Sequence, residues 1–213
     1  MSPRRLPLFP LPLVLLPGVT TPLHIFEPRY RRLLADCLAG DRRFGLIYLP
    51  RDTAEDDLPR GHVGTVAAIE ASDPLPDGRS NILVRGTERF ALSALVPADA
   101  PYHVGEVDAF DDEPEPSEPM TRLAEHVRER FAQVATAARA LADDRAPVPA
   151  LEDAPALLAF RIASLIDMDA AARQRLLASR SPTARLREIG AVLERAAAPL
   201  ERRAAVHTRA KTN

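Results

Sequence analysis

The stretch LPLFPLPLVLLPGVTTPLHIFEPRYRRLL, residues 6–34, decides how the rest of this chain can fold. Proline occurs six times in it, and because proline lacks a backbone donor and clashes with the preceding helical turn, the stretch cannot be one helix. The pattern predicts short extended pieces, a turn at Pro17-Gly18 and a strand over Thr20–Phe26. Pro28 then predicts the first turn of a helix that ends near Leu38. So many apolar residues in so little regular structure need a continuous core beneath them.

Composition and charge place the chain among ordinary globular proteins. Of its 213 residues, 46% are apolar and 27% are charged, and the net charge of −2 gives no general attraction to nucleic acid or to an anionic membrane. The single cysteine, Cys37, cannot form an internal disulfide, which fits a reducing compartment. The apolar run after Arg5 is broken by prolines and is shorter than the roughly 20 apolar residues of a transmembrane helix. We therefore expect a cytoplasmic protein without a membrane anchor.

The middle of the chain has the residue pattern of β-structure. Asp73–Arg79, DPLPDGR, predicts one connecting turn, and Gly86-Thr87 predicts a second hairpin. Together with the N-terminal pieces, these strands are enough for a small barrel or sandwich. The expected strands are Phe44–Leu49, His62–Ser72, Asn81–Arg85, Glu88–Val96 and Tyr102–Phe110.

An abrupt change of composition separates this region from the rest. Asp111–Pro119, DDEPEPSEP, holds five acids and three prolines, which predicts an exposed, semi-rigid linker. Beyond it, apolar residues recur at helical spacing, and Pro199 is expected to kink or interrupt the last helix. The expected helices are Met120–Ala142, Ala154–Ile166, a short one capped by Asp169 that ends at Leu177, and a long one that opens at Ser181-Pro182.

Strands first and helices afterwards favour an α+β architecture over an alternating α/β sheet. We expect a β-rich lobe over residues 1–110, a linker over 111–119 and a helical bundle over 120–213. The bundle ends in a basic tail that we expect to be disordered and solvated, with Arg202, Arg203, Arg209 and Lys211.

The residues that catalysis would need are scarce. Lys211 is the only lysine, which argues against Schiff-base chemistry, a phosphate-binding P-loop and a serine–lysine protease dyad. Cys37 falls on the apolar stripe of the first predicted helix, where a thiol is a small buried hydrophobe. No histidine has a second ligand at metal-binding spacing, and His24 is expected to be structural. We expect no catalytic residue, no metal and no cofactor; an enzyme with a dispersed site stays as a minor alternative.

Nucleic-acid binding has only weak support. Residues 61–64, GHVG, have the spacing of a backbone-clamping loop, but they are flanked by predicted strands where that loop needs helices. Aromatic residues are 5% of the chain and tryptophan is absent, so stacking platforms are few.

Several motifs resemble the N-terminal domain of the Lon protease family. They are LPLFPL at 6–11, LPG at 16–18 and, most specifically, PLHIFEPRYRRLL at 22–34, with weaker landmarks in the same order over nearly the whole chain. The resemblance implies a PUA-like pseudo-barrel followed by a helical bundle, a role in substrate recognition, and a stand-alone domain without the family's ATPase and protease parts. The residues it singles out, as structural or substrate-binding, are Phe9, His24, Phe26, Glu27, Arg29, Tyr30, Gly64, Asp77, Gly78, Gly86, Arg89 and Phe90.

The leading hypothesis is a non-catalytic module that binds unfolded or exposed apolar protein segments, as an adaptor in quality control or proteolysis. An extended peptide could add to a sheet edge of the β-rich lobe. A separate protease is an expected partner, and exposed apolar area leaves room for a homodimer. RNA binding through the PUA-like lobe is the alternative, which net charge disfavours. Phe26 and Tyr30 are expected to be buried anchors, and Glu27 and Arg29 to pair locally.

Overall fold

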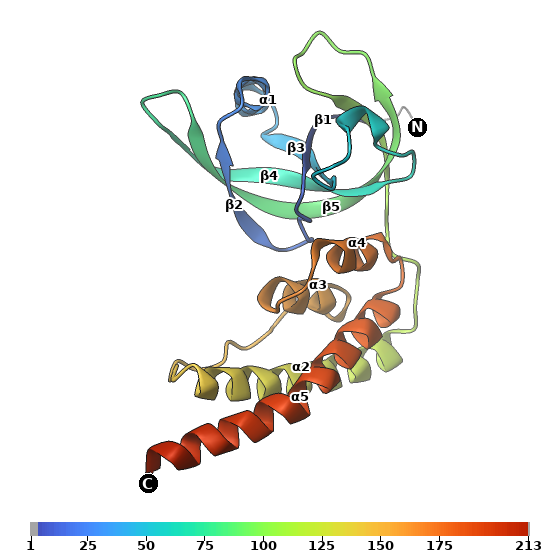
Figure 1. The fold of residues 1–213 in the computed structure, drawn as a ribbon. Helices are drawn as coiled ribbons and strands as arrows, with labels where there is room; N and C mark the ends of the chain where they lie inside the picture. Colours follow the sequence, from blue (N-terminus) through green and yellow to red (C-terminus); the bar gives the residue numbers. More distant parts are fainter. Residues whose placement is uncertain (1–3, 213) are drawn as a thin grey trace. The chain divides into compact units, whose positions relative to one another are not determined.

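The chain folds into two compact units. A computed structural model describes residues 4–212, with side chains described through His207 (Figure 1). One unit holds the chain up to Asp112 together with Asp167–Arg180, and the other holds Glu113–Ile166 and the chain from Ser181 onward. Residues 167–180 thus group with the β-rich unit, whereas the sequence pattern had placed them in the helical lobe. In the described part of the chain, no helix is long and apolar enough to cross a membrane.

A single mixed sheet forms the β-rich unit. Its order is β2-β5-β4-β3-β1-β6, and β6 also pairs with β5, so five strands close into a ring while β2 joins β5 outside it. β1 and β3 are parallel, and the other pairs are antiparallel. The strands are β1 Arg4–Leu11, β2 Thr20–Ile25, β3 Arg43–Tyr48, β4 Val63–Pro74, β5 Ser80–Val96 and β6 Val104–Ala109.

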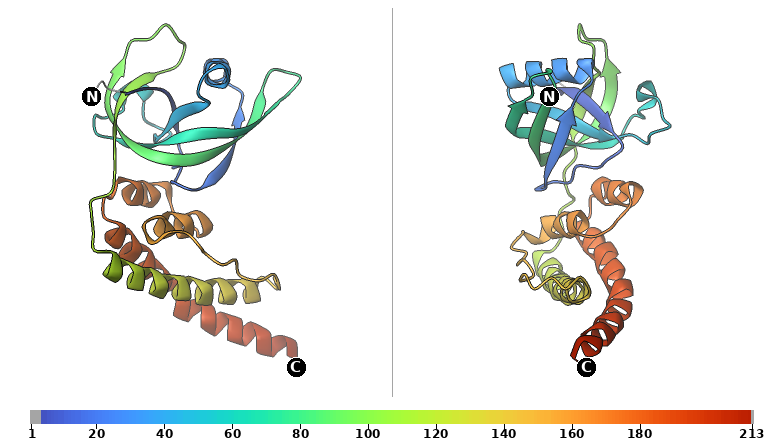
Figure 2. Two further views of the ribbon diagram at one scale, coloured as in Figure 1. Left: turned by 180° about the vertical axis from the view of Figure 1, so that it is seen from behind. Right: turned by 60° about the vertical axis from the view of Figure 1, so that its left-hand side comes forward.

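The predicted hairpin at Gly86-Thr87 is wrong, because β5 runs unbroken through both residues. Gly86 instead allows the loop before β2 to approach β5 closely. A Cβ atom there would lie 2.3 Å from the carbonyl oxygen of Leu16. Around it, the Gly18 N–H donates to the Gly86 carbonyl, and the Gly86 N–H donates to that of Val19. The glycine therefore lets the loop before β2 lie directly on β5, and β5 curves as one long strand (Figures 1 and 2).

Two apolar clusters fill this unit. One lies beneath α1 (Pro28–Ala39), which packs on the sheet through a stripe that includes Tyr30, Leu33, Leu34 and Cys37, as the sequence predicts. The other contains Leu8, Phe90 and residues of the ring strands. Phe26 is not the predicted buried anchor: it comes after the last β2 residue, turns away from the core and is 58% exposed, whereas Tyr30 is 3% exposed.

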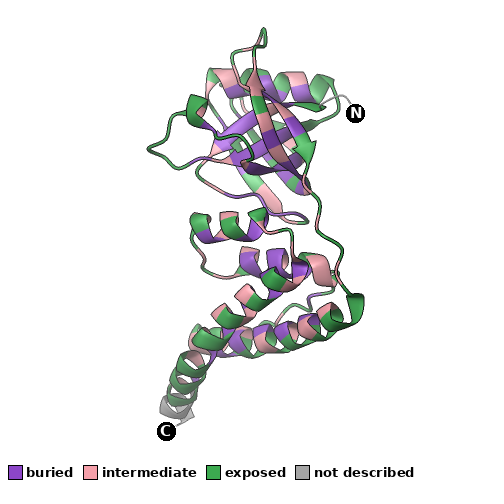
Figure 3. Cartoon of the chain, turned by 90° about the vertical axis from the view of Figure 1, so that its right-hand side faces the viewer, coloured by how far each residue is buried: buried purple, intermediate pink, exposed green. Residues whose placement is uncertain are grey.

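Three helices make up the second unit: α2 (Ser117–Leu141), α3 (Pro155–Leu165) and α5 (Pro182–Thr212). α2 and α5 run side by side in the same direction (Figure 2). Two contacts show this: Glu115 bonds Thr183 where the helices start, and Asp143 lies 3.1 Å from His207 near their ends. Each helix has a buried side and an exposed side (Figure 3). Pro199 was predicted to kink or interrupt the last helix; α5 continues through it, so the interruption does not occur.

The segment between β6 and α2 is held in place more firmly than a free linker. α2 begins at Ser117, before the predicted Met120, so the last linker residues are helical. Glu115 accepts hydrogen bonds from the Thr183 N–H and from the hydroxyls of Ser181 and Thr183.

The basic tail is helical to Thr212; of its four residues, Arg202 and Arg203 are exposed, and the side chains of Arg209 and Lys211 lie outside the described ones.

Candidate functional site

A small apolar pocket opens beside the outer edge of β2, in the β-rich unit. Its volume is about 170 Å³. Residues of β1, β2 and α1 line it together with the segments that follow the two strands. The lining residues are Phe9, Leu11, Leu13, Leu23, His24, Phe26, Glu27 and Tyr30.

Tilted aromatic rings in contact with one another form one wall of the pocket. Phe9 and Tyr30 pack with ring centroids 4.1 Å apart, and Phe9 also packs on Phe44 at 5.9 Å. These rings are nearly buried, so their positions are fixed by the core. Phe26, by contrast, exposes most of its side chain at the mouth. The pocket thus combines a rigid apolar interior with an exposed aromatic lip.

Two polar side chains stand at the rim. His24 Nδ1 lies 2.8 Å from the Asn81 side-chain oxygen, and its ring stacks near Phe26 with centroids 6.1 Å apart. The carboxylate of Glu27 accepts a 3.0 Å hydrogen bond from Arg29 Nε, which agrees with the predicted local pair. Arg29 spans to Glu55 on its other side. The rim therefore carries groups that could bond a ligand's backbone, while the interior offers only apolar contact and the Tyr30 ring.

The edge of β2 next to the pocket has free pairing capacity. Within residues 4–212, β2 pairs with β5 and with no second strand. The Gly86 N–H donates to the Val19 carbonyl, so Val19 and Gly86 are a hydrogen-bonded pair. By alternation along the register, the backbone groups of Thr20, Pro22 and His24 point away from β5. The free edge offers carbonyls from these residues but lacks one donor at Pro22, which is where proline is tolerated in a sheet.

Of the residues singled out by the sequence, Phe9, His24, Phe26, Glu27 and Tyr30 come together at this pocket. Arg29 lies just behind it. The other predicted site residues lie elsewhere.

Those other residues lie in packing contacts, in a turn or in the interior of the β-rich unit. A Cβ at Gly64 would lie 2.4 Å from the Phe90 ring, so both belong to one packing contact inside the ring of strands. Asp77 and Gly78 form the β4–β5 turn, where Gly78 has φ +81° and its backbone lies against Arg31. The last of them, Arg89, is 7% exposed and donates to the carbonyl of Leu177 in α4 (Ala170–Ala178).

Leu11, Leu13 and Leu23 were not singled out from the sequence, although they line the pocket. The sequence marks them only as apolar residues in a run of similar ones. Which members of such a run face a cavity depends on where β1 ends, and that is fixed by pairing with β3 and β6 far along the chain.

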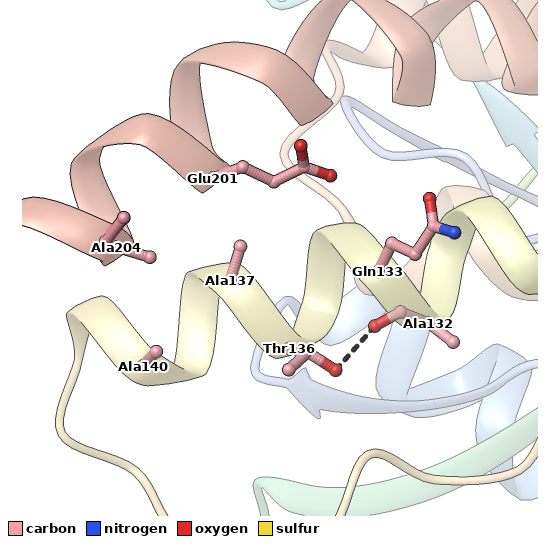
Figure 4. A pocket seen from close by; sticks show the side chains of 8 residues that line it. Ala132, Gln133, Thr136, Ala137, Ala140, Glu201 and Ala204 are labelled. Atoms are coloured by element: carbon pink, nitrogen blue, oxygen red, sulfur yellow. Dashed lines mark hydrogen bonds between the residues drawn. The ribbon is translucent and has the colours of Figure 1, made fainter. Parts of the chain in front are cut away.

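A larger hollow lies between α2 and α5 in the helical unit (Figure 4). It is an open groove of about 520 Å³. Alanines form most of its lining, and the Thr136 hydroxyl is already bonded to the Ala132 carbonyl at 2.7 Å. Only Gln133 and Glu201 add longer polar groups. Such a shallow stripe of small side chains offers little shape to a ligand, and we give it no function.

The side chains that the structure describes include neither a grouped set of metal ligands nor a reactive thiol. Among the side chains the structure describes, no three His, Cys, Asp or Glu residues are grouped to hold a metal ion. Cys37 is buried and donates to the Arg43 carbonyl, and burial, followed by the charges of Asp41 and Asp36, raises the pKa of its thiol to about 12. A thiol with that pKa is not a nucleophile at neutral pH.

Comparison with known proteins agrees with the geometry. The family described as "ATP-dependent protease La (LON) substrate-binding domain" matches residues 5–195. Lon protease 2 of Herpetosiphon aurantiacus is 31% identical over 194 residues, which are 89% of this chain and 23% of that protein. The Lon protease of Roseiflexus castenholzii is 29% identical over 91% of this chain and 24% of its own length. The chain thus spans about a quarter of the length of these relatives.

Solved structures share the fold. A Lon N-terminal domain protein from Xanthomonas campestris superposes with a TM-score of 0.62 at 32% identity, covering 88% of this chain and 98% of that one. The N-terminal domain of the Mycobacterium avium complex Lon protease has the same fold, with a TM-score of 0.66 at 22% identity over 90% of this chain and 98% of that one.

The α+β fold and the matching family model together define a substrate-binding class of domain. This chain belongs to the LON substrate-binding domain family, which confirms the predicted resemblance and the predicted fold class.

Proposed function

We propose that this chain is a non-catalytic recognition module that binds exposed apolar segments of other proteins at the pocket beside β2. One observation carries the proposal: an apolar pocket with a rigid aromatic wall and the 58%-exposed Phe26 at its mouth opens next to an unpaired strand edge. Family membership supports it, since the family is named for substrate binding.

The pocket's size sets the kind of side chain it takes. A dry apolar cavity of about 150 Å³ binds benzene, so a pocket of about 170 Å³ suits one phenylalanine, leucine or similar side chain. Fully burying such a side chain contributes roughly 1.5–3 kcal/mol. That is less than the roughly 4 kcal/mol that even a millimolar complex needs. A client must therefore make further contacts.

The edge of β2 supplies those contacts. An extended client segment can pair with the outward carbonyls of Thr20, Pro22 and His24, while alternate side chains point toward the pocket. Because Pro22 withholds one donor, the added strand is incompletely bonded, and binding is weak and reversible. Weak binding of many sequences fits a module that samples unfolded chains.

RNA binding is the alternative function, and the charge pattern disfavours it. At least eight of the fifteen arginines on the β-rich unit are paired with carboxylates at 2.5–3.6 Å, which leaves fewer of them for phosphates. These eight arginines are Arg4, Arg5, Arg29, Arg32, Arg43, Arg79, Arg85 and Arg89.

A binding assay with one matched pair of variants tests the proposal. Phe26→Ser removes the exposed aromatic lip, and Val206→Ser removes an equally exposed apolar side chain (67%) from the helical unit. With a permanently unfolded, carboxymethylated protein as client, we expect saturable binding that weakens several-fold in Phe26→Ser and is unchanged in Val206→Ser. Absence of binding by the unaltered chain, or equal loss in both variants, would overturn the proposal.

We also propose an adaptor role, in which the chain presents clients bound at this site to a separate ATP-dependent protease. Added to a mixture of such a protease and an unfolded client, the chain should accelerate degradation, and Phe26→Ser should remove the acceleration. If degradation is unaffected, the chain holds clients without delivering them.

Whether two copies associate is tested by sedimentation over a range of concentrations, where a homodimer would raise the apparent mass.

A further inference from the structure

Glu55 is the point where three distant side chains meet behind the pocket. It opens a 3₁₀ turn, η1 (Glu55–Asp57), in the loop after β3. Its carboxylate accepts two hydrogen bonds from the Arg29 guanidinium, at 2.7 and 2.8 Å, and one from the Tyr30 hydroxyl at 2.9 Å. His103 Nε2, from the loop before β6, lies 3.3 Å away. The two residues that it bonds are consecutive in the first turn of α1.

Both of these bonded residues belong to the pocket or support it. The Tyr30 ring lines the cavity, and its hydroxyl points to Glu55. Arg29 joins Glu55 to the rim residue Glu27 and lies 4.4 Å over the Tyr30 ring. Glu55 itself does not line the cavity, so any effect it has on a ligand passes through Tyr30 and the Arg29–Glu27 pair.

A buried phenol needs such a partner. Tyr30 is 3% exposed, and a buried hydroxyl without a hydrogen bond is costly. Burial, with the added effect of the Glu55 charge, raises the pKa of Tyr30, so the hydroxyl stays protonated and keeps donating throughout the neutral range. Bonds to an ionised acceptor are short and strong, and they restrict the ring more than water would. Without Glu55, the ring would have to turn or draw water into the wall of the pocket.

We propose that Glu55 is a positioning residue for this site: by holding the Tyr30 hydroxyl and the Arg29 fork, it fixes the shape of the pocket that receives the client's apolar side chain. This inference rests on the proposed function. It assigns a role in setting affinity to the loop over residues 51–60, which contributes no lining residue to the cavity.

Substitutions in one turn of the loop separate this role from a general effect of charge. Glu55→Ala removes the acceptor, and Asp56→Ala removes the neighbouring carboxylate, which is 86% exposed and has only a 3.7 Å approach to His103. Tyr30→Phe keeps the ring in the pocket and removes only the hydroxyl. With the carboxymethylated client as probe, we expect Glu55→Ala to weaken binding about five- to tenfold. Asp56→Ala should leave it unchanged, and Glu55→Gln, whose amide oxygen can still accept from Tyr30, should recover part of the loss.

Two further readouts test the route through Tyr30. In the Tyr30→Phe background, Glu55→Ala should have a clearly smaller effect on affinity than in the unaltered chain, because the bond it removes is already gone. The chain has no tryptophan and three tyrosines, so in a Tyr48→Phe, Tyr102→Phe background the near-ultraviolet tyrosine band reports Tyr30 alone. Glu55→Ala should shift that band to shorter wavelength, as expected when a phenol loses a carboxylate acceptor.

The outcomes distinguish this inference from the proposed function. If the unaltered chain binds, Phe26→Ser weakens binding and Glu55→Ala does not, the pocket is the site and the role of Glu55 is refuted. Equal effects of Glu55→Ala and Asp56→Ala would also refute it. If the unaltered chain does not bind the client, the proposed function fails, and the tyrosine band still decides whether Glu55 holds Tyr30.

Discussion

Arg89→Met is a substitution for which the structure predicts a large loss of stability in the β-rich unit. Arg89 Nη1 donates to the carbonyls of Leu177 and Ser179, both at 2.7 Å, and Nη2 donates to Asp112 at 2.5 Å. These partners lie at the end of α4 (Ala170–Ala178) and just past β6, so one guanidinium ties two returning segments to β5. The Phe110 ring, 5.0 Å away, covers it.

The magnitude follows from the burial of this group. Methionine can fill much of the same volume, but it leaves the Asp112 carboxylate and two carbonyls without the donors that arginine supplies. Breaking a buried ion pair by removing one partner costs about 3–5 kcal/mol. Because the Asp112 side chain keeps 29% of its exposure, water can replace part of the loss, and we expect about 3 kcal/mol. This is a large share of the roughly 5–15 kcal/mol by which domains are stable.

Hydrogen exchange locates that loss. In Arg89→Met, amides of α4 should lose protection before those of β4 and β5, because α4 is held to the sheet by Arg89 and by the 2.8 Å bond from Gln174 to the Val63 carbonyl. Arg89→Lys should rescue little, since an ammonium cannot form the same fork. Arg79→Met, an exposed control at the β4–β5 turn, should leave exchange unchanged. A stability within about 1 kcal/mol of the unaltered chain, with α4 still protected, would refute the reasoning.

Three other predictions concern single side chains. Bonds from the hydroxyls of Ser181 and Thr183 hold the pKa of Glu115 below its ordinary value of 4.5. The stabilising effect of the Glu115 carboxylate is therefore complete above about pH 4.5 and is lost as the pH falls through the lower pKa of the folded state. Between about pH 6 and 2, the midpoint temperature of thermal unfolding should fall more steeply for the unaltered chain than for Glu115→Gln, and parallel curves would contradict this. Cys37 should resist a thiol reagent at pH 8 in the folded protein and react at once in urea, whereas rapid labelling of the folded protein would show that it is not buried. Gly86→Ala should destabilise the β-rich unit, since its Cβ would collide with the Leu16 carbonyl, and unchanged urea unfolding would mean that the loop moves aside without cost.

Local signals predict much of this fold. Pro28 at the first helical position, the apolar stripe of α1 and the Asp169 side chain that accepts from the Ala172 N–H are all read directly from neighbouring residues. Such features need no knowledge of the rest of the chain, because each is decided within one or two helical turns.

The misses share a different cause. Gly86 fits a hairpin turn equally well by local rules, and only the approach of the loop at Leu16 explains why it lies inside a strand. Of the two outcomes that Pro199 predicts, a kink or a break, the break does not occur: α5 continues through this residue beside α2. Phe26 is apolar and follows a buried residue, so its exposure depends on where the strand ends rather than on its own chemistry. Tertiary contacts decide each of these cases.

The candidate site was predicted only in part, for the same reason. The conspicuous run from His24 to Tyr30 contributes four residues to the pocket lining. Glu55, however, lies in a loop whose acidic pair Asp56-Asp57 has the pattern of a solvated surface. Its bonds to Arg29 and Tyr30 join positions separated by 26 and 25 residues, and no local pattern indicates them.

The most direct test of the central claim is an NMR titration of the labelled chain with a short extended peptide that carries one phenylalanine. If exposed apolar segments bind at the pocket, the largest shifts fall on Leu13, Leu23 and Phe26, with smaller ones along the outer edge of β2, and a peptide with alanine in place of phenylalanine loses most of them. Shifts centred on the groove between α2 and α5, or equal shifts for the two peptides, would contradict binding at this pocket.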